Sequence, residues 1–252
     1  MKNKVNKIFI KISILIFWLL IWEIFARKIN LSFVLPTVSE TFYALYLLVQ
    51  DRNFLLTVIT SLMRITEGFI LGSIIAIALG ILSAKVSFFK HLFSPINTVL
   101  KSSPVAVIII MLWVLIGGKN VPVAVSLIMV APIIWQNIID GYDAIDPQLD
   151  EVCLIYNFNF SKRFRILVLP NLLKYLLPGL ISASGLAWKA GVAAEIICMT
   201  KNSIGAQIYN AKYLLDGPVM FAWTIVILIL SYLIEQLIKL LIGGISKKCH
   251  LS

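Results

Sequence analysis

The sequence predicts an all-α membrane protein with about six transmembrane helices. Three observations predict this fold class. Of the 252 residues, 60% are hydrophobic and only 13% are charged, whereas a soluble domain has about 25% charged residues. The mean hydropathy is +0.96. Six apolar runs follow one another along the chain, and each approaches the length of about 20 residues that crosses a bilayer.

The first apolar run, residues 8–26, follows the basic stretch MKNKVNK and imitates a signal peptide. It is longer than the roughly 7–15 residues of a signal-peptide core, and no small-residue cleavage site follows it. We therefore expect an uncleaved first span. The second run, residues 56–84, contains Gly68 and Gly72. Small residues at this spacing let two helices approach closely in lipid, so this pair predicts helix packing.

The third and fourth runs, residues 96–117 and 121–139, are separated only by the tight turn GGKN. Lys101, near the start of the third run, is interpreted as an interfacial lysine. The fifth and sixth runs are residues 172–199 and 219–243. Together the runs indicate one transmembrane domain over residues 1–252, with core spans in 56–243 and no room for a soluble domain of ordinary size.

The net charge of +10 reports topology rather than nucleic-acid binding, because Lys and Arg mark cytoplasmic loops in membrane proteins. Six spans place both termini on one side. With a cytoplasmic N-terminus, the inside segments carry 13 Lys and Arg and the outside segments carry 7, while Lys101 and Lys189 lie in spans, which accounts for all 22. The bias predicts that both termini are cytoplasmic.

The sequence indicates no catalytic or metal site. Cys153, Cys198 and Cys249 are odd in number and lack paired spacing, so they predict neither a disulfide framework nor metal ligands. No G-x-x-x-x-G-K-[ST] motif is present to bind ATP phosphates. His91 and His250 lie near loop ends without an evident nucleophile beside them. We therefore do not expect an enzyme.

The segment 143–170 is too polar to cross the membrane and falls on the cytoplasmic side. Asp146 and Pro147 predict a helix start, with acids in the first turn, where they suit the helix dipole. Asn157 tolerates the left-handed conformation in which many helices end. Residues 160–169 read as a second short helix stopped by Pro170. Two interpretations remain open. The segment is either a docking element for a protein partner, or a helix pair in the lipid interface, with the positive charges of Lys162, Arg163 and Arg165 toward anionic headgroups.

Two charged residues fall in the fifth span. Lys189 and Glu195 are six residues apart, so they lie on different faces of one helix and cannot pair with each other. Intramembrane charges usually mark a pathway or a buried pair. Lys189, Glu195 and the neighbouring Trp188 therefore either line a translocation route or protomer seam, or Lys189 snorkels and Glu195 is satisfied by backbone or Arg64 near the outer interface.

Several segments, in order from about residue 30 to 240, resemble the permease subunits of ATP-binding-cassette (ABC) importers. The resemblance to the E-A-A-x3-G-x9-I-x-L-P motif of these subunits rests on Glu151, Val152, Cys153, Asn157, Leu167, Leu169 and Pro170. NLSFVLPTVSET, TSLMRITEGFILG, GLAWKAGVAAEII and SIGAQIYNA resemble segments of the sulfonate, nitrate and taurine branch. Val152 and Cys153 replace the two alanines of the motif, and Asn157 replaces its glycine.

The resemblance implies a type I ABC importer permease fold, with residues 143–170 as the loop that couples the spans to a cytoplasmic ATPase. It implies two ATPase subunits that carry ATP and Mg, a second permease copy, an external solute-binding protein and a bacterial cell membrane, with no cofactor on this chain and no nucleic-acid partner. The solute is then a sulfonate-, nitrate- or taurine-like anion or a thiamine precursor. Residues 203–217 are either a re-entrant helix or part of the dock for the binding protein. The alternative is a self-sufficient secondary transporter or channel that uses Lys189 and Glu195.

Overall fold

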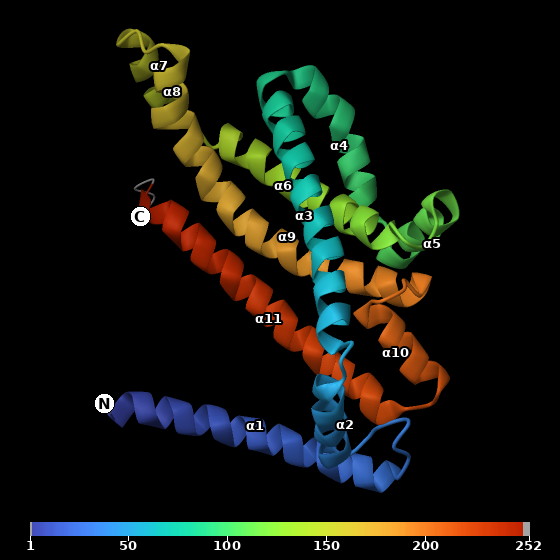
Figure 1. Cartoon of the computed structure of the whole chain (residues 1–252). Helices are drawn as coiled ribbons and strands as arrows, with labels where there is room; N and C mark the ends of the chain where they lie inside the picture. The colour runs from blue at the N-terminus through green and yellow to red at the C-terminus, as the bar shows by residue number, and fades with distance from the viewer. Residues whose placement is uncertain (1, 249–252) are drawn as a thin grey trace.

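The computed structural model describes residues 2–248, with side chains described for residues 9–244, so Cys249 and His250 lie outside it. Every regular element in this part of the chain is helical (Figure 1). In chain order the elements are α1 (Lys2–Ile29), α2 (Val38–Gln50), α3 (Phe54–Lys85), α4 (Ser87–Ser102), α5 (Val105–Ile116), α6 (Val121–Asp143), α7 (Pro147–Ile155), α8 (Phe160–Arg163), the π-helix η1 (Phe164–Val168), α9 (Leu169–Cys198), α10 (Ile204–Tyr213) and α11 (Gly217–Lys248).

Five helices are long and apolar enough to cross a membrane: α1, α3, α6, the continuous helix Phe160–Cys198, and α11. The sixth candidate is the pair α4 and α5, whose axes are bent by 107° relative to each other. The prediction of an all-α protein with about six crossings is confirmed. The helix α2, between the first two crossings, was not expected.

The direction of α3 and α6 decides whether the bent pair crosses the membrane. Gly68 of α3 lies against Val123 of α6, and Gly80 of α3 lies against Ile138 of α6. Residue numbers rise together along both helices, so α3 and α6 are parallel. The chain between them must therefore return from one side of the membrane to the other. The helices α4 and α5 together make this third crossing.

The third crossing differs from the expected span of residues 96–117. It begins at Ser87 and is broken at Ser103 and Pro104. Proline disfavours the helical conformation of the residue before it, and Ser103 is accordingly extended, with φ −74° and ψ 133°. Lys101 lies at the end of α4, near the middle of the crossing rather than at its start.

The core is the packing of α3, α6 and α9, and small residues allow it. Gly191 of α9 lies between Ile65 of α3 and Ser126 of α6, where a Cβ would be 2.6 Å from Ile65 Cγ1 and 2.7 Å from Ser126 Oγ. At Gly72 of α3 a Cβ would be 2.7 Å from the carbonyl oxygen of Leu127. These contacts place the backbones of the three helices closer than alanine would allow.

The ends of α1 and α11 meet at the side of the molecule opposite both termini (Figure 1). Trp22 of α1 donates to the carbonyl oxygen of Pro36 at 2.9 Å, and Gly217 at the start of α11 packs against Ser32 and Phe33. Six crossings with this junction leave the two ends of the described chain on one side. The side that bears the termini also bears α7 and α8.

Candidate functional site

The helix α7 begins as the sequence predicts. The Asp146 carboxylate accepts a hydrogen bond from the backbone N–H of Gln148 at 2.8 Å, and Pro147 occupies the first turn. Proline suits this position because the missing N–H has no partner within the helix. The predicted helix start at Asp146 and Pro147 is confirmed.

The helix α7 ends in a left-handed turn at Asn157, whose φ is 50°. The N–H of Asn157 donates to the carbonyl oxygen of Leu154 at 3.0 Å, and the N–H of Phe158 donates to that of Cys153 at 2.9 Å. This pair of bonds is a Schellman motif, which normally places glycine at the left-handed residue. Asparagine is among the few other residues that adopt this conformation readily, so the geometry expected for Asn157 is present.

An ion pair that the sequence did not predict holds α7 against α8. The Arg163 guanidinium donates to both carboxylate oxygens of Asp150, from Nε at 2.5 Å and from an Nη at 2.8 Å. These hydrogen bonds lower the pKa of the Asp150 carboxyl below its ordinary value. The carboxylate is therefore charged at neutral pH, and the pair weakens only when the pH falls through this lowered pKa. The turn at Asn157 and this bidentate pair together fix the angle between the two helices.

The helix pair presents apolar side chains to its surroundings. Leu154 is 69% exposed, Ile155 75%, Tyr156 71% and Phe160 64%. Of the motif residues, Glu151 and Val152 are also exposed, whereas Cys153 and Leu167 are buried and Leu169 and Pro170 are partly buried. Some residues of the motif therefore pack inside the helix pair, and others form part of its exposed surface.

The expectation that Pro170 stops the second helix is wrong. The chain is helical without a break from Phe160 to Cys198. The π-helix η1 precedes the proline, and the N–H of Leu169 donates to the carbonyl oxygen of Phe164, five residues back. A proline ring clashes with the carbonyl four residues earlier in a regular α-helix, and the wider π-turn provides room for it. The Asn171 side chain donates to the carbonyl oxygen of Leu167 at 3.0 Å.

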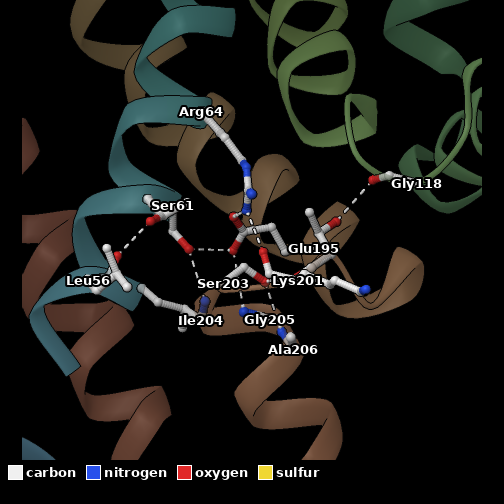
Figure 2. A network of polar contacts seen from close by, with 12 residues as sticks. Leu56, Ser61, Arg64, Gly118, Glu195, Lys201, Ser203, Ile204, Gly205 and Ala206 are labelled. Carbon is white, nitrogen blue, oxygen red and sulfur yellow. Dashed lines mark hydrogen bonds and ion pairs between the residues drawn. The ribbon is translucent and has the colours of Figure 1, made fainter. Parts of the chain in front are cut away.

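A second polar site lies where α9 turns into α10, and it centres on Glu195 (Figure 2). The Glu195 side chain is fully buried. Its Oε2 accepts from the Ser61 hydroxyl of α3 at 2.8 Å and from the N–H of Gly205 at 3.4 Å. Ser61 Oγ in turn accepts from the N–H of Ile204 at 2.9 Å. Glu195 and Ser61 thus bind the first amides of α10, which a helix leaves without partners of its own.

Arg64 lies on the other side of the Glu195 carboxylate (Figure 2). Its Nη1 is 4.0 Å from Glu195 Oε1 and donates to the carbonyl oxygen of Lys201 at 3.1 Å. Oε1 itself accepts no hydrogen bond. Of the two interpretations of Glu195, this geometry matches satisfaction by backbone and Arg64 within one chain.

Trp188 and Lys189 point in different directions. The Trp188 side chain is buried, and its Nε1 donates to the carbonyl oxygen of Ile227 in α11 at 3.2 Å. It lines an apolar pocket of about 560 Å³ between α3, α9 and α11 together with Ile65 and Leu233. Lys189 is exposed on another face of α9. The structure thus separates these two residues and brings Glu195 to Ser61 and Arg64 instead.

Two pairings at these sites gave no signal in the sequence analysis. Ser61 is 134 residues from Glu195, and Asp150 is 13 residues from Arg163, so neither pair has a local spacing that reveals it.

Glu67 is exposed in the middle of α3. Within residues 9–244 its carboxylate has neither a hydrogen-bond nor an ion-pair partner.

Glu195→Ala should destabilise the protein, and Glu195→Gln should be tolerated. Alanine leaves the Ser61 hydroxyl and the Gly205 N–H without their buried acceptor, at about 1–3 kcal/mol for each group. The glutamine carbonyl oxygen can accept both bonds. The measurement is the thermal midpoint of the purified protein in detergent. An alanine variant as stable as the native chain would contradict the anchoring of α10 by Glu195.

Comparison with known proteins agrees with this arrangement of helices. Residues 68–247 match the family model described as "Binding-protein-dependent transport system inner membrane component". A bicarbonate transport system permease protein of Synechococcus elongatus is 29% identical over 226 residues, which cover 83% of this chain and 79% of the relative.

Two further relatives extend the comparison. A putative ABC transporter permease protein of Methanocaldococcus jannaschii is 26% identical over 241 residues, which cover 93% of this chain and 90% of the relative. A putative aliphatic sulfonates transport permease protein of Bacillus subtilis is 24% identical over 183 residues, which cover 72% of this chain and 66% of the relative. The similarity therefore reaches across most of the length of each protein.

Proposed function

Because this chain belongs to the family of binding-protein-dependent transport system inner membrane components, we propose that the tip formed by α7 and α8 docks on the ATPase of an ABC importer. Family membership makes the chain a multi-pass inner-membrane permease subunit with no catalytic function of its own. It also implies a complex with an ATPase and a binding protein. The proposal concerns which residues make the contact with the ATPase, and what passes through.

The observation that carries the proposal is the exposed apolar surface at the tip. Leu154, Ile155, Tyr156 and Phe160 are each more than half exposed. The Schellman turn at Asn157 and the Asp150–Arg163 pair hold them in one arrangement. A rigid amphipathic helix pair with an uncovered apolar face fits a groove in a protein partner. ATP-driven movement of that partner then reaches the spans through α9.

The combined length of α8, η1 and α9 favours this docking over placement of the tip in the lipid interface. The continuous helix Phe160–Cys198 has 39 residues, which is about 58 Å at 1.5 Å per residue. The hydrocarbon core is about 30 Å thick. Figure 1 shows α7 and α8 beyond the end of α11, at the far end of α9. This arrangement supports a tip that extends past the headgroups into the cytoplasm, with both termini on the same side.

We also propose a second permease copy, an external binding protein at the opposite end of the molecule near α10, and a small anion as solute. Relatives named for bicarbonate and for aliphatic sulfonates support the anion, because both solutes carry negative charge at neutral pH. We therefore favour an anion over a thiamine precursor.

Lys189 remains our candidate for the pathway or protomer seam, whereas Trp188 and Glu195 are better explained by contacts within the chain. This argues against a self-sufficient transporter built on Lys189 and Glu195.

Ile155→Asp should lower co-purification of the ATPase and solute uptake together. A carboxylate at a contact that becomes buried on docking loses its hydration, which costs several kcal/mol. The measurement is the amount of ATPase that co-purifies with the chain from membranes. Tyr213→Asp is the matched control, because Tyr213 is 80% exposed at the opposite end and its substitution should keep the ATPase bound. Full retention of the ATPase by Ile155→Asp would exclude this tip as the dock.

A further inference from the structure

The break between α4 and α5 lies in the middle of the membrane. Leu100, near the end of α4, lines the same small cavity as Ala131, Pro132 and Trp135. These three residues are at the centre of α6, which runs from Val121 to Asp143. Because α4 and α5 together cross the bilayer, their break at Ser103 and Pro104 is at mid-depth and not in a loop.

Polar groups gather around this break. The Lys101 ammonium donates to Gln136 Oε1 of α6 at 3.5 Å, and Gln136 Nε2 donates to Asp140 Oδ1 at 2.8 Å. No side chain caps the start of α5, and the N–H groups of its first two residues, Val105 and Ala106, have no partner in the described residues. Lys101, Ser102 and Asp140 are exposed. This row of polar groups extends from the break toward the side of α7.

Lipid is an unsuitable neighbour for this surface. Unpaired backbone groups at membrane depth are tolerated only inside protein or beside a water-filled cavity, and charged side chains in spans usually face such a cavity. The exposed surface of α11 has the opposite character, with Leu228, Leu233, Leu237 and Leu240 each more than half exposed. The exposed surface of α11 therefore suits lipid, and the polar break does not.

We infer that the α4–α5 break, with Lys101 and Gln136, lines the water-filled route of the solute, and that Lys101 is the cation that a passing small anion meets. The role of Lys101 rests on the anionic solute proposed above. An ammonium has three donors, and within the described residues Gln136 is the one hydrogen-bond partner of Lys101. The remaining donors are available to a carboxylate, carbonate or sulfonate oxygen.

A second lysine borders the same half-helix. Ile109 of α5 packs in one cluster with Ala190 of α9, and Leu186 of α9 lies against that cluster. Lys189 precedes Ala190 and is exposed. The helix α5 is thus flanked by a lysine at its start and by another on the helix that it packs against. Two cations beside one route suit an anion better than a neutral or cationic solute.

The first test measures whether the break is in contact with water. Ser102→Cys and Ser103→Cys are compared with Leu228→Cys on α11, where Leu228 is 63% exposed, in membranes that contain the assembled importer. The reagents are charged methanethiosulfonates, which react with thiolates and therefore need water at the thiol. The unchanged chain, with its own cysteines, gives the background rate. We expect both serine positions to react at least about tenfold faster than the α11 position, which corresponds to about 1.4 kcal/mol in the barrier. Equal rates would overturn the inference.

The second test measures the charge that the route presents. The sulfonate-bearing and the trimethylammonium-bearing methanethiosulfonate are compared at Ser103→Cys, each rate divided by its rate with a free thiol in solution. Lys101→Met should lower the anion-to-cation ratio by at least about tenfold, because an ammonium beside the thiol attracts one reagent and repels the other. Lys101→Arg should keep the ratio. An unchanged ratio in Lys101→Met would overturn the role of Lys101.

These outcomes are independent of the docking proposal. Co-purification of the ATPase should be the same in all five variants as in the native chain, because none of them alters the tip. Loss of docking in Ile155→Asp leaves the labelling results unaffected, and failure of labelling leaves the docking result unaffected.

Discussion

Gly68→Ala should abolish accumulation of folded protein. A Cβ at this position would lie 2.7 Å from the Cβ of Ser126 and even closer to the carbonyl oxygen of Val123. The backbone of α6 cannot yield as a flexible side chain does, so α3 and α6 must separate along their length. Overpacking of a tight core costs about 1–3 kcal/mol and occasionally more, and we expect the upper end of that range. The measurement is the yield of monodisperse protein from membranes and its thermal midpoint.

Gly185→Ala is the matched control for this prediction. Nothing lies within 4 Å of a Cβ built at Gly185, which is also in a membrane-spanning helix. Alanine is the better helix former by about 0.5–1 kcal/mol, so this variant should be at least as stable as the native chain. If both glycine variants behave alike, the close approach of α3 to α6 is not the determinant of the core.

Asn157→Val should uncouple the chain from its ATPase, whereas Asn157→Gly should be tolerated. The φ of 50° at Asn157 costs an L-residue with a branched side chain about 1–2 kcal/mol, and glycine adopts it freely. Valine therefore shifts the end of α7 away from the left-handed turn and changes the angle between α7 and α8. The exposed side chains on either side of the turn then no longer present one surface. Co-purification of the ATPase and solute uptake should fall together.

Asn30→Val separates this effect from general backbone strain. Asn30 has φ 52° and ends α1 at the opposite side of the molecule, so valine imposes a similar local cost there. The Asn30 variant should lose some stability and keep the ATPase bound. Wild-type binding and uptake by Asn157→Val would remove the turn from the docking mechanism, even if the apolar surface around Ile155 proved essential.

Local patterns predicted much of this fold because each depends on a few neighbouring residues. The apolar runs predicted the membrane crossings. Asp146 and Pro147 predicted where α7 begins, and Asn157 predicted where it ends. Each of these signals acts within one or two turns of the chain. The membrane strengthens them, because a span must satisfy its own backbone hydrogen bonds.

The features that could not be predicted depend on contacts between distant segments. Two prolines with similar sequence signals behave differently: Pro104 breaks a crossing, and Pro170 is absorbed in a continuous helix by a π-turn. The outcome depends on what packs beside each proline. Likewise the partners of Glu195 come from α3 and from the start of α10, and only the packing of α3 on α9 brings them together.

The unbroken helix from Phe160 to Cys198 acts as a lever arm. One end carries the exposed tip, and the other carries Glu195, which holds α10. Gly191 of this helix is wedged between α3 and α6, and this tight contact is a natural fulcrum. It lies about 46 Å from Phe160 and about 10 Å from Cys198 along the helix. A tilt of about 5° about Gly191 therefore moves the Phe160 end by about 4 Å and the Cys198 end by about 1 Å in the opposite direction, so a large movement of the tip becomes a small, reversed movement beside α10.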